Sequence, residues 1–444
     1  MKKKIQTWFI YAFLLFIYKC FFDFVFLPTY YSVFSYMTGA EYTYMFDKYF
    51  ISLLVFALLV ILSFDIFDRP NIYSAVLTLL YTICIIPMLS VYAFVSFVTI
   101  DEIFYPTIFW IILLLFFVVK QKNSNKLRSI VKIPTLKPAS EGILCICIFG
   151  SLICWAWAGF PLLFSFSDST AQRIALRANS MPTILGYVFM LLGGVIVPYL
   201  FARFLNEKKI FYSILTFISG FLLFSINGMK TWIFLYLFVI ALFILCDLLK
   251  NNIKLICFNI IIGLMILLVF CVVVYYKFGV IDFLSQFGRI FCIPNGIGFR
   301  SITFFKNNEV LLLRESILRH LFDTPYPGGS DFFIDYGANR TLTSARSNNG
   351  LWGDAFRNFG FIGMLIYPFL IGWVLDKIRI SIDSLNLKFQ IFVMFLMIWN
   401  SVNISFFTWL LTGGVMVVYL LNGFFAKEDF KYRKKGVYND TKRE

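Results

Sequence analysis

The stretch LICFNIIIGLMILLVFCVVVY, residues 255–275, contains no charged residue. A helix of about twenty apolar residues crosses the roughly 30 Å hydrocarbon core of a bilayer, and soluble domains rarely contain so long an apolar run. This stretch therefore predicts a membrane-spanning helix, and it sets the expected class of the whole chain.

The composition is typical of a chain that crosses the membrane many times. Of the 444 residues, 60% are hydrophobic and 14% are charged, and the mean hydropathy is +0.82. Soluble domains of this length contain far fewer apolar residues. We therefore predict an all-α polytopic membrane protein that forms a single membrane domain over residues 1–444. About twelve transmembrane helices are expected, at residues 8–27, 49–64, 72–91, 103–119, 143–160, 183–204, 210–226, 231–249, 255–275, 359–375, 389–402 and 406–421.

Lysine and arginine are distributed unevenly among the loops between these helices. With the N-terminus in the cytoplasm, the inner loops include the basic run 120–137 and the C-terminal cluster, whereas the outer loops are nearly balanced in charge. Cytoplasmic loops carry an excess of basic residues, so both termini are expected inside. The net charge of +15 is thus a topology signal and gives no support to nucleic-acid binding. The first helix follows MKKK without a small-residue cleavage site, which favours a retained signal anchor.

This orientation places two notable loops outside the membrane, residues 161–182 and the large loop 278–358 between the ninth and tenth helices. The outer loops contain more arginine than lysine, and the inner loops contain more lysine. A guanidinium group binds phosphate or carboxylate with two parallel hydrogen bonds, which an ammonium cannot do. Arginines at the outer lipid headgroups are the alternative explanation. We expect some of them to bind an anionic substrate.

The first outer loop contains two arginines on one predicted helical face. Ser169 and Gln172 form a capping-box pattern, so a short helix is expected to begin there. Arg173 and Arg177 then lie at i and i+4, where like charges cost ~0.2 to 0.5 kcal/mol. No carboxylate lies three or four residues away to offset this cost. An external anion would do so, and contact with lipid phosphates is the alternative.

The large loop divides into several patterns. Residues 282–304 alternate apolar residues with basic ones that include Arg289, and we expect an amphipathic stretch lying in the membrane interface. The turn at residues 227–230, between the seventh and eighth helices, leaves Lys230 at the same outer surface, where it is either a lipid anchor or a ligand contact.

Residues 309–321 have the apolar periodicity of a helix. On such a helix Glu315 and Arg319 are i,i+4 partners, whereas Arg314 has no acidic partner at helical spacing. His320 follows directly and is either a solvated or capping side chain or a functional one. We therefore predict that Arg314 is available to an anion.

The end of the loop combines glycines with ionisable residues. Gly353 and Gly360 are two helical turns apart and would let another backbone approach closely. Asp354, Arg357 and Asn358 lie on neighbouring positions of the same predicted helix, and an ionisable cluster at the mouth of a helix bundle is a candidate site. Alternatively, Asp354 only stabilises the helix N-terminus.

The stretch GLWGDAFRNFGFIG, residues 350–363, resembles the one that closes the large outer loop of bacterial oligosaccharide repeat-unit polymerases, the Wzy-type O-antigen and capsule polymerases. Twelve spans and an arginine-bearing loop between the fifth and sixth are also similar to that family. The related ligases that attach O-antigen to lipid A carry a histidine in the large loop, and His320 with Gly328 and Gly329 loosely approximates their pattern.

The resemblance implies a glycosyltransferase that moves a growing glycan from its polyprenyl diphosphate onto a sugar hydroxyl of a second lipid-linked repeat unit. It implies a bacterial cytoplasmic membrane protein whose active site faces the periplasm or cell exterior. Polyprenyl-diphosphate-linked oligosaccharides, membrane lipids and a chain-length regulator protein are the expected partners. Because the leaving group is an anionic diphosphate, the site needs fixed cations, and we expect neither a metal nor a cofactor.

The candidate residues follow from these roles. A base must reach the acceptor hydroxyl, and His320 and Asp354 lead, with Asp331 and Asp335 behind. The side chains expected to bind the diphosphate or the sugars are Arg173, Arg177, Lys230, Arg289, Arg314, Arg346, Arg357 and Asn358. The aromatic residues expected to stack on sugar rings, or alternatively to line the membrane interface, are Tyr326, Phe332, Tyr336 and Trp352.

Other functions fit the sequence less well. With one histidine in the chain and eight of nine cysteines in predicted spans, neither a multi-histidine metal site nor a disulfide framework is expected. An O-antigen ligase is the nearer alternative, and a flippase of lipid-linked sugars the more distant one. Transporters place ionisable groups near the membrane midplane. The predicted spans, away from their cytoplasmic ends, contain only Lys19 and Asp23, which are expected to pair at i,i+4.

Overall fold

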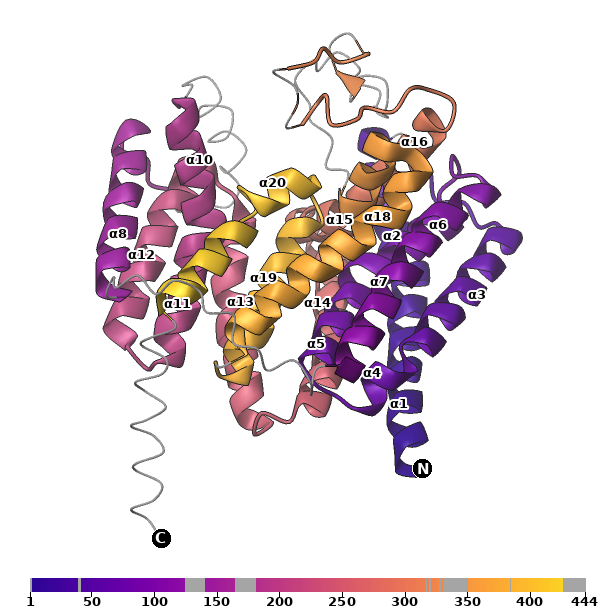
Figure 1. Cartoon of the computed structure of the whole chain (residues 1–444), viewed down its shortest axis with the longest axis horizontal. Coiled ribbons are helices and arrows are strands. Elements are labelled where there is room, and N and C mark those ends of the chain that lie inside the picture. Colours follow the sequence, from indigo (N-terminus) through magenta and orange to yellow (C-terminus); the bar gives the residue numbers. More distant parts are fainter. Residues whose placement is uncertain are drawn as a thin grey trace. The chain divides into compact units, whose positions relative to one another are not determined.

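The computed structural model describes residues 2–38, 41–123, 140–163, 181–316, 318, 321–326, 329–330, 350–383 and 385–425. Within these ranges the regular elements are helices, and one isolated β-bridge joins Tyr42 to Val95 (Figure 1). Nine helical segments in these ranges are long and apolar enough to cross a membrane. The predicted all-α membrane fold is confirmed at this level, and every predicted span overlaps a helix, although turns at residues 411–414 interrupt the span predicted at 406–421. The count of twelve spans and their orientation stay predictions.

The chain divides into two compact units. Unit 1 comprises residues 1–128, 252–374 and 398–408, and unit 2 comprises residues 129–251, 375–397 and 409–444. Unit 1 contains α1 (Lys2–Phe21), η1 (Phe22–Phe26), α2 (Leu27–Thr38), α3 (Phe46–Leu62), α4 (Phe64–Asp68), α5 (Ile72–Leu80), η2 (Tyr81–Ile85), α6 (Ile86–Phe94), η3 (Ile100–Ile103), α7 (Phe104–Asn123), α14 (Ile253–Phe278), α15 (Asp282–Phe291) and α16 (Ile293–Phe305). Unit 2 contains α8 (Ser140–Trp157), α10 (Thr183–Leu191), η4 (Leu192–Ile196), α11 (Val197–Asn206), α12 (Ile210–Asn227) and α13 (Lys230–Leu248). Three helices have residues in both units, α18 (Gly350–Ile382), α19 (Leu387–Ser401) and α20 (Phe406–Leu410).

Three of the long helices contain a wider π-helical turn. The elements η1, η2 and η4 each end two residues before a proline, at Pro28, Pro87 and Pro198 respectively. Proline has no backbone N–H and its ring clashes with the carbonyl four residues earlier. A π-turn widens the helix at that point, so the helix continues through the proline.

The first π-turn lies beside a buried ion pair. Lys19 Nζ is 2.6 Å from Asp23 Oδ2, and both side chains are fully buried. The predicted i,i+4 pair is therefore confirmed. The carbonyl of Asp23 has lost its helical donor, because Leu27 N–H bonds to Phe22 and residue 28 is proline; the Tyr42 hydroxyl donates to it instead, at 3.3 Å.

Helices α15 and α16 form a hairpin that enters the interior of unit 1. At its tip, Phe291 lies edge-on to Phe22, 5.9 Å between ring centroids, and Phe22 is near the middle of the apolar segment Gln6–Ser35. Cys292, at the turn, is fully buried. The predicted stretch lying flat in the membrane interface is therefore wrong. Gly288 allows the hairpin to pack this closely, because a Cβ at this position would come within 1.9 Å of the Tyr30 ring.

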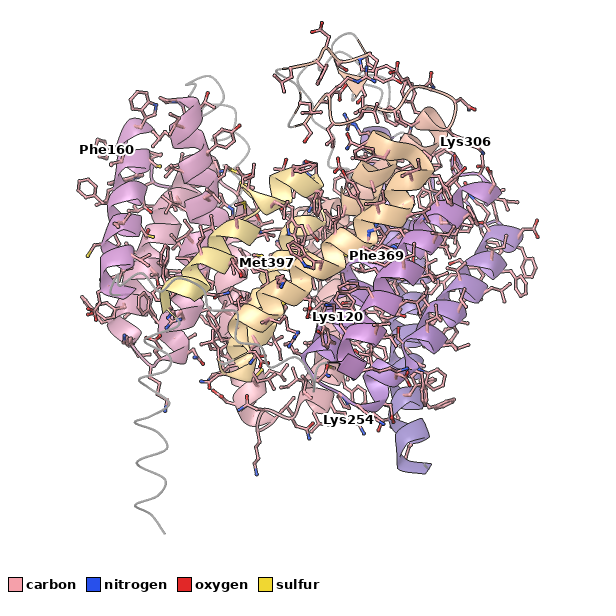
Figure 2. All side chains as sticks on the ribbon, viewed as in Figure 1. Lys120, Phe160, Lys254, Lys306, Phe369 and Met397 are labelled. Atoms are coloured by element: carbon pink, nitrogen blue, oxygen red, sulfur yellow. The ribbon has the colours of Figure 1, made fainter. Side chains whose placement is uncertain are left out.

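Two labelled lysines mark the two ends of unit 1 (Figure 2). Lys254 donates to Thr7 at 2.8 Å, at the same end of the unit as the N-terminus (Figures 1 and 2). Lys306 and the polar segment that follows it lie at the opposite end (Figure 2). The candidate site is built at this second end.

Candidate functional site

Helix α18 is interrupted at Gly360, where the backbone φ of 56° and ψ of −139° are not helical. Only glycine adopts this conformation readily, because a Cβ would be strained there. Residues 350–359 therefore form a separate short helix. The expectation that Gly353 and Gly360 lie on one continuous helical face is wrong, since the chain changes direction at the second glycine.

Residues 309–311 have no regular structure and residues 312–316 form turns, so the helix predicted over residues 309–321 is wrong for this part. Leu312 and Leu313 have positive φ angles of 49° and 66°, which an α-helix does not allow. The backbone N–H groups of Leu311 and Leu312 donate, at 3.0 Å each, to carbonyls at the end of the short helix. These long-range hydrogen bonds replace the local ones that a helix would make.

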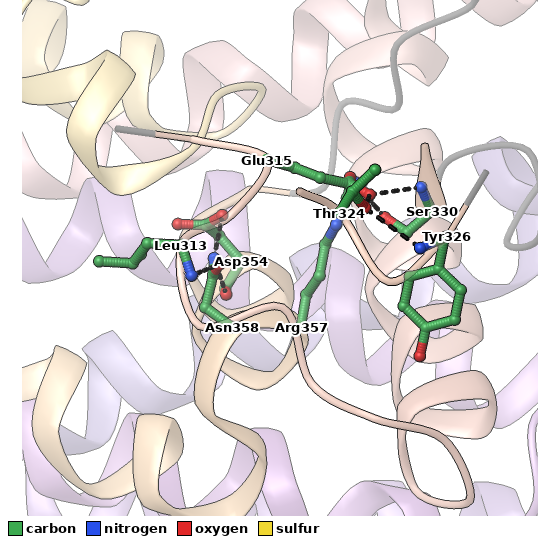
Figure 3. Close-up of polar contacts among 8 residues, drawn as sticks. All are labelled: Leu313, Glu315, Thr324, Tyr326, Ser330, Asp354, Arg357 and Asn358. Atoms are coloured by element: carbon green, nitrogen blue, oxygen red, sulfur yellow. Dashed lines mark hydrogen bonds and ion pairs between the residues drawn. The ribbon is translucent and has the colours of Figure 1, made fainter. Parts of the chain in front are cut away.

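Asp354 is buried, and both of its carboxylate oxygens accept hydrogen bonds; Figure 3 draws the one from Asn358. Asn358 Nδ2 donates to Oδ1 at 3.0 Å, and the backbone N–H of Phe406, at the start of α20, donates to Oδ2 at 3.0 Å. Asn358 Oδ1 in turn accepts from the backbone N–H of Leu313 at 3.0 Å. Asp354 therefore satisfies a helix N-terminus, as the alternative interpretation held, although the helix is α20 rather than its own. This geometry favours a positioning role over proton abstraction.

Glu315 and Arg357 form a buried ion pair beside this cluster (Figure 3). The Nη2 atom of Arg357 lies 2.6 Å from Glu315 Oε2 and 2.5 Å from the Ser330 hydroxyl. Glu315 also accepts from the Ser330 backbone N–H at 2.6 Å and from the Thr324 hydroxyl at 2.7 Å. The loop is thereby fastened to the short helix.

The environment of Glu315 favours its ionised form. Burial alone would raise its pKa, but hydrogen bonds from Ser330 and Thr324 and the charge of Arg357 together hold the pKa below its ordinary value. The predicted partner of Glu315, Arg319, lies outside the described residues. Sequence reasoning missed the pair with Arg357, because the two residues are separated by a loop whose path has no local signal.

Arg314 has an acidic partner, so the prediction that it is unpaired is wrong. Its Nη2 atom lies 2.5 Å from Glu309 Oε1. The same nitrogen donates to the Val310 carbonyl at 3.1 Å, and Nε donates to the Leu311 carbonyl at 2.9 Å. The turn brings Glu309 within reach, whereas a spacing of five residues would separate the two side chains on a helix.

Arg289 differs from these arginines. It lies in the last turn of α15, it is exposed, and its side chain makes no ion pair or hydrogen bond with any residue in the described ranges. It is two residues from Phe291, at the tip of the buried hairpin.

Lys230 is the first residue of α13, in unit 2. The predicted tight turn before it is confirmed. Gly228 ends α12 with a left-handed φ of 62°, and the Asn227 side chain accepts from the backbone N–H of Met229 at 2.9 Å. Lys230 is half-buried and has further contacts, so its position is set by the turn.

The aromatic residues of the site are used in packing. Trp352 is buried, a Cβ on Gly298 would come within 2.4 Å of its ring, and its Nε1 donates to Asn295 Oδ1 at 3.2 Å. The Tyr326 ring is also buried, and its hydroxyl donates to the Glu309 carbonyl at 2.5 Å. Neither ring presents a free face to a sugar, so the stacking role expected of these two residues is wrong in this structure.

Several predicted site residues lie outside the described residues, namely Arg173, Arg177, His320, Asp331, Phe332, Asp335, Tyr336 and Arg346. Of the other candidates, Arg314 lies on one segment and Asp354, Arg357 and Asn358 lie on another, and hydrogen bonds from the backbone of residues 311–313 join the two segments. Within the described residues no group of three or more His, Cys, Asp or Glu side chains is arranged to hold a metal ion.

Comparisons of the chain with models of protein families, with curated proteins and with solved structures find no match. The functional assignment therefore rests on the chemistry of the site and on the motif at residues 350–363.

Proposed function

We propose that this protein polymerises polyprenyl-diphosphate-linked oligosaccharide repeat units at the outer face of the bacterial cytoplasmic membrane. The observation that carries the proposal is the conjunction of motif and network. The residues of the motif that resembles the repeat-unit polymerases, Asp354, Arg357 and Asn358, are the ones that fasten the polar loop at one end of unit 1. That end is opposite to Lys254 and the N-terminus (Figures 1 and 2).

In this proposal the arginines divide into two roles. Arg357 is committed to Glu315 and positions the loop. Arg289, exposed and without an ionic partner in the described ranges, is available to bind the diphosphate of the lipid carrier. Arg173, Arg177 and Arg346 are proposed to share this task on the grounds of their sequence. Fixed guanidinium groups stabilise the charge that develops on the diphosphate as it leaves.

The base is proposed to be His320, because both oxygens of Asp354 are occupied. The acceptor sugar hydroxyl forms a bond to the anomeric carbon of the donor while the bond from that carbon to the diphosphate oxygen breaks. A neutral imidazole takes the proton of the hydroxyl, and the electron pair of the broken bond stays with the lipid diphosphate. Asp354 and Asn358 hold the loop on which His320 lies in sequence.

A flippase is the second candidate, and two observations favour it. Transporters use discontinuous helices and ionisable groups near the membrane midplane. The α15–α16 hairpin and the buried Lys19–Asp23 pair are features of this kind. An O-antigen ligase has the chemistry of a polymerase and differs in its acceptor.

Deletion of the gene separates these functions. A polymerase mutant is expected to display a single repeat unit on the cell surface, because lipid-linked units are still flipped across the membrane and still attached to their final acceptor. Complete loss of the surface sugar would exclude the polymerase and support either a flippase or a ligase. Lipid-linked glycan would then accumulate on the outer face of the membrane if the protein is a ligase, and on the inner face if it is a flippase.

A further inference from the structure

Hydrogen bonds fix the orientation of the Arg314 guanidinium, but they use only some of its N–H groups. Its Nε–H and both Nη2 hydrogens face acceptors, which are the carbonyls of Leu311 and Val310 and the carboxylate of Glu309. Its Nη1 atom has no acceptor in the described part of the chain, and the side chain is 20% exposed. An arginine that is fixed by two carbonyls and retains free N–H groups is preorganised for an anion.

Glu309 is the one carboxylate that Arg314 contacts, and it is loosely held. Its backbone is fixed by the hydrogen bond from the Tyr326 hydroxyl, but its side chain is 62% exposed and has Arg314 as its one partner in the described ranges. Glu315, by contrast, is 17% exposed and accepts from Thr324, Ser330 and Arg357. Breaking the exposed Arg314–Glu309 pair therefore costs little free energy, whereas breaking the more buried Glu315–Arg357 pair costs more.

We propose that Glu309 is an internal competitor that a diphosphate must displace from Arg314. The inference rests on the proposed function, because it takes the diphosphate of the lipid carrier as the ligand. In the empty site the Glu309 carboxylate neutralises the guanidinium. When a diphosphate arrives, Glu309 swings into solvent, and the free Nη1 hydrogens together with the released Nη2 hydrogen bind the phosphate oxygens.

This arrangement selects for charge. A singly charged anion gains no more from Arg314 than Glu309 does, and it also loses translational freedom that the tethered carboxylate has already lost. A diphosphate carries more than one negative charge, so its Coulomb attraction to the guanidinium is correspondingly larger. The site therefore excludes the singly charged phosphodiester headgroups of ordinary lipids, which are present in large excess.

The proposal is tested by measuring the binding of inorganic diphosphate to the purified full-length protein in detergent, by titration calorimetry. An exposed ion pair contributes up to about 1 kcal/mol, so Glu309→Gln is expected to bind diphosphate up to about fivefold more tightly than the unmodified protein. Adding Arg314→Gln to Glu309→Gln is expected to abolish this gain in affinity. In Glu309→Gln, phosphatidylglycerol added to the micelles is expected to compete with diphosphate, and in the unmodified protein it is not.

Asp101→Asn is the matched control. Asp101 is an exposed carboxylate of unit 1 that pairs with Lys306, so the variant removes one negative charge without freeing Arg314, and its affinity is expected to stay unchanged. Equal affinity in Glu309→Gln and the unmodified protein, an equal gain in Asp101→Asn, or competition by phosphatidylglycerol in the unmodified protein would each overturn the proposal. Because no glycosyl transfer is measured, a negative result here does not contradict the proposed polymerase. A flippase phenotype on gene deletion would contradict the polymerase but not the competition between Glu309 and a diphosphate for Arg314.

Discussion

Glu315 and Arg357 are 42 residues apart in the sequence, and their side chains meet at 2.6 Å in a largely buried position. The pair joins a loop without regular structure to a short helix bounded by glycines of positive φ, Gly350 and Gly360. Removing one partner leaves the other charge buried and uncompensated.

Arg357→Ala is therefore expected to destabilise the protein strongly. Loss of one member of a buried ion pair costs about 3 to 5 kcal/mol, whereas Arg314→Ala, at a more exposed pair, is expected to cost about 1 kcal/mol or less. The measurement is the free energy of unfolding in detergent, followed by intrinsic fluorescence during denaturant titration. Equal losses in the two variants would contradict the structural role given to Arg357.

The stability of the protein is expected to depend on the ionisation of Glu315. Its pKa is lower in the folded state than its ordinary value of 4.5, so the unfolded state binds more protons as the pH falls through that range. The stabilisation is complete above the ordinary value and is lost as the pH falls through the folded value, from about pH 5 downward. Thermal unfolding of the unmodified protein and of Glu315→Gln should converge toward low pH, and parallel curves would refute this contribution.

Gly360→Ala tests the break in α18. A methyl group at this position would meet Val310 Cγ1 at 3.6 Å, an ordinary contact, so any penalty comes from the backbone conformation. We expect a loss of about 1 to 3 kcal/mol. Gly263→Ala, in α14, is the control, since an added Cβ there meets nothing within 4 Å. If both variants have the same thermal stability, the break at Gly360 is not required.

Lys19→Met is expected to be more harmful than the double variant Lys19→Met/Asp23→Leu. The single change leaves a carboxylate buried without a partner, at a cost of about 3 to 5 kcal/mol, whereas replacing both charges with apolar groups is often close to neutral. Thermal stability and yield from membranes would be compared in a double-mutant cycle. Additive effects of the two substitutions would show that the pair is not coupled.

Arg289→Ala and Arg177→Ala are expected to remove long surface glycan while the protein still inserts in the membrane. Both changes delete a guanidinium that the proposed function assigns to the diphosphate. The readout is the chain-length ladder on a gel, together with the amount of protein in the membrane fraction. Arg379→Ala, which breaks a pair with Asp376 in unit 2, serves as the control and should leave the ladder normal. A normal ladder from Arg289→Ala would remove this residue from the site.

The long helices could be predicted from the sequence because each of them satisfies its own backbone hydrogen bonds. The run at residues 255–275 needs no distant partner, and its helix α14 extends a few residues beyond the predicted ends. The Lys19–Asp23 pair was predictable for the same reason, since helical spacing alone brings the two side chains together.

The loop and the hairpin could not be predicted in this way. Leu312 and Leu313 adopt positive φ because the N–H groups around them bond to a helix more than forty residues later. The amphipathic pattern of residues 282–304 is the same for a stretch lying on the membrane and for a hairpin that buries one face inside the protein. The contacts that distinguish them, such as Gly288 against Tyr30 and Phe291 against Phe22, join residues far apart in the sequence, and no local pattern encodes them.

The buried tip of the α15–α16 hairpin has a consequence for how the protein is made. Phe291 and Cys292 are enclosed by residues of the first apolar segment, yet α15 is too short to be threaded across the bilayer as an independent span. The hairpin therefore has to be held by helices on both sides of it in the chain, because Phe22 and Phe26 precede it and Trp352, which packs on α16, follows it. During synthesis the hairpin is thus left without part of its covering until α18 has been made.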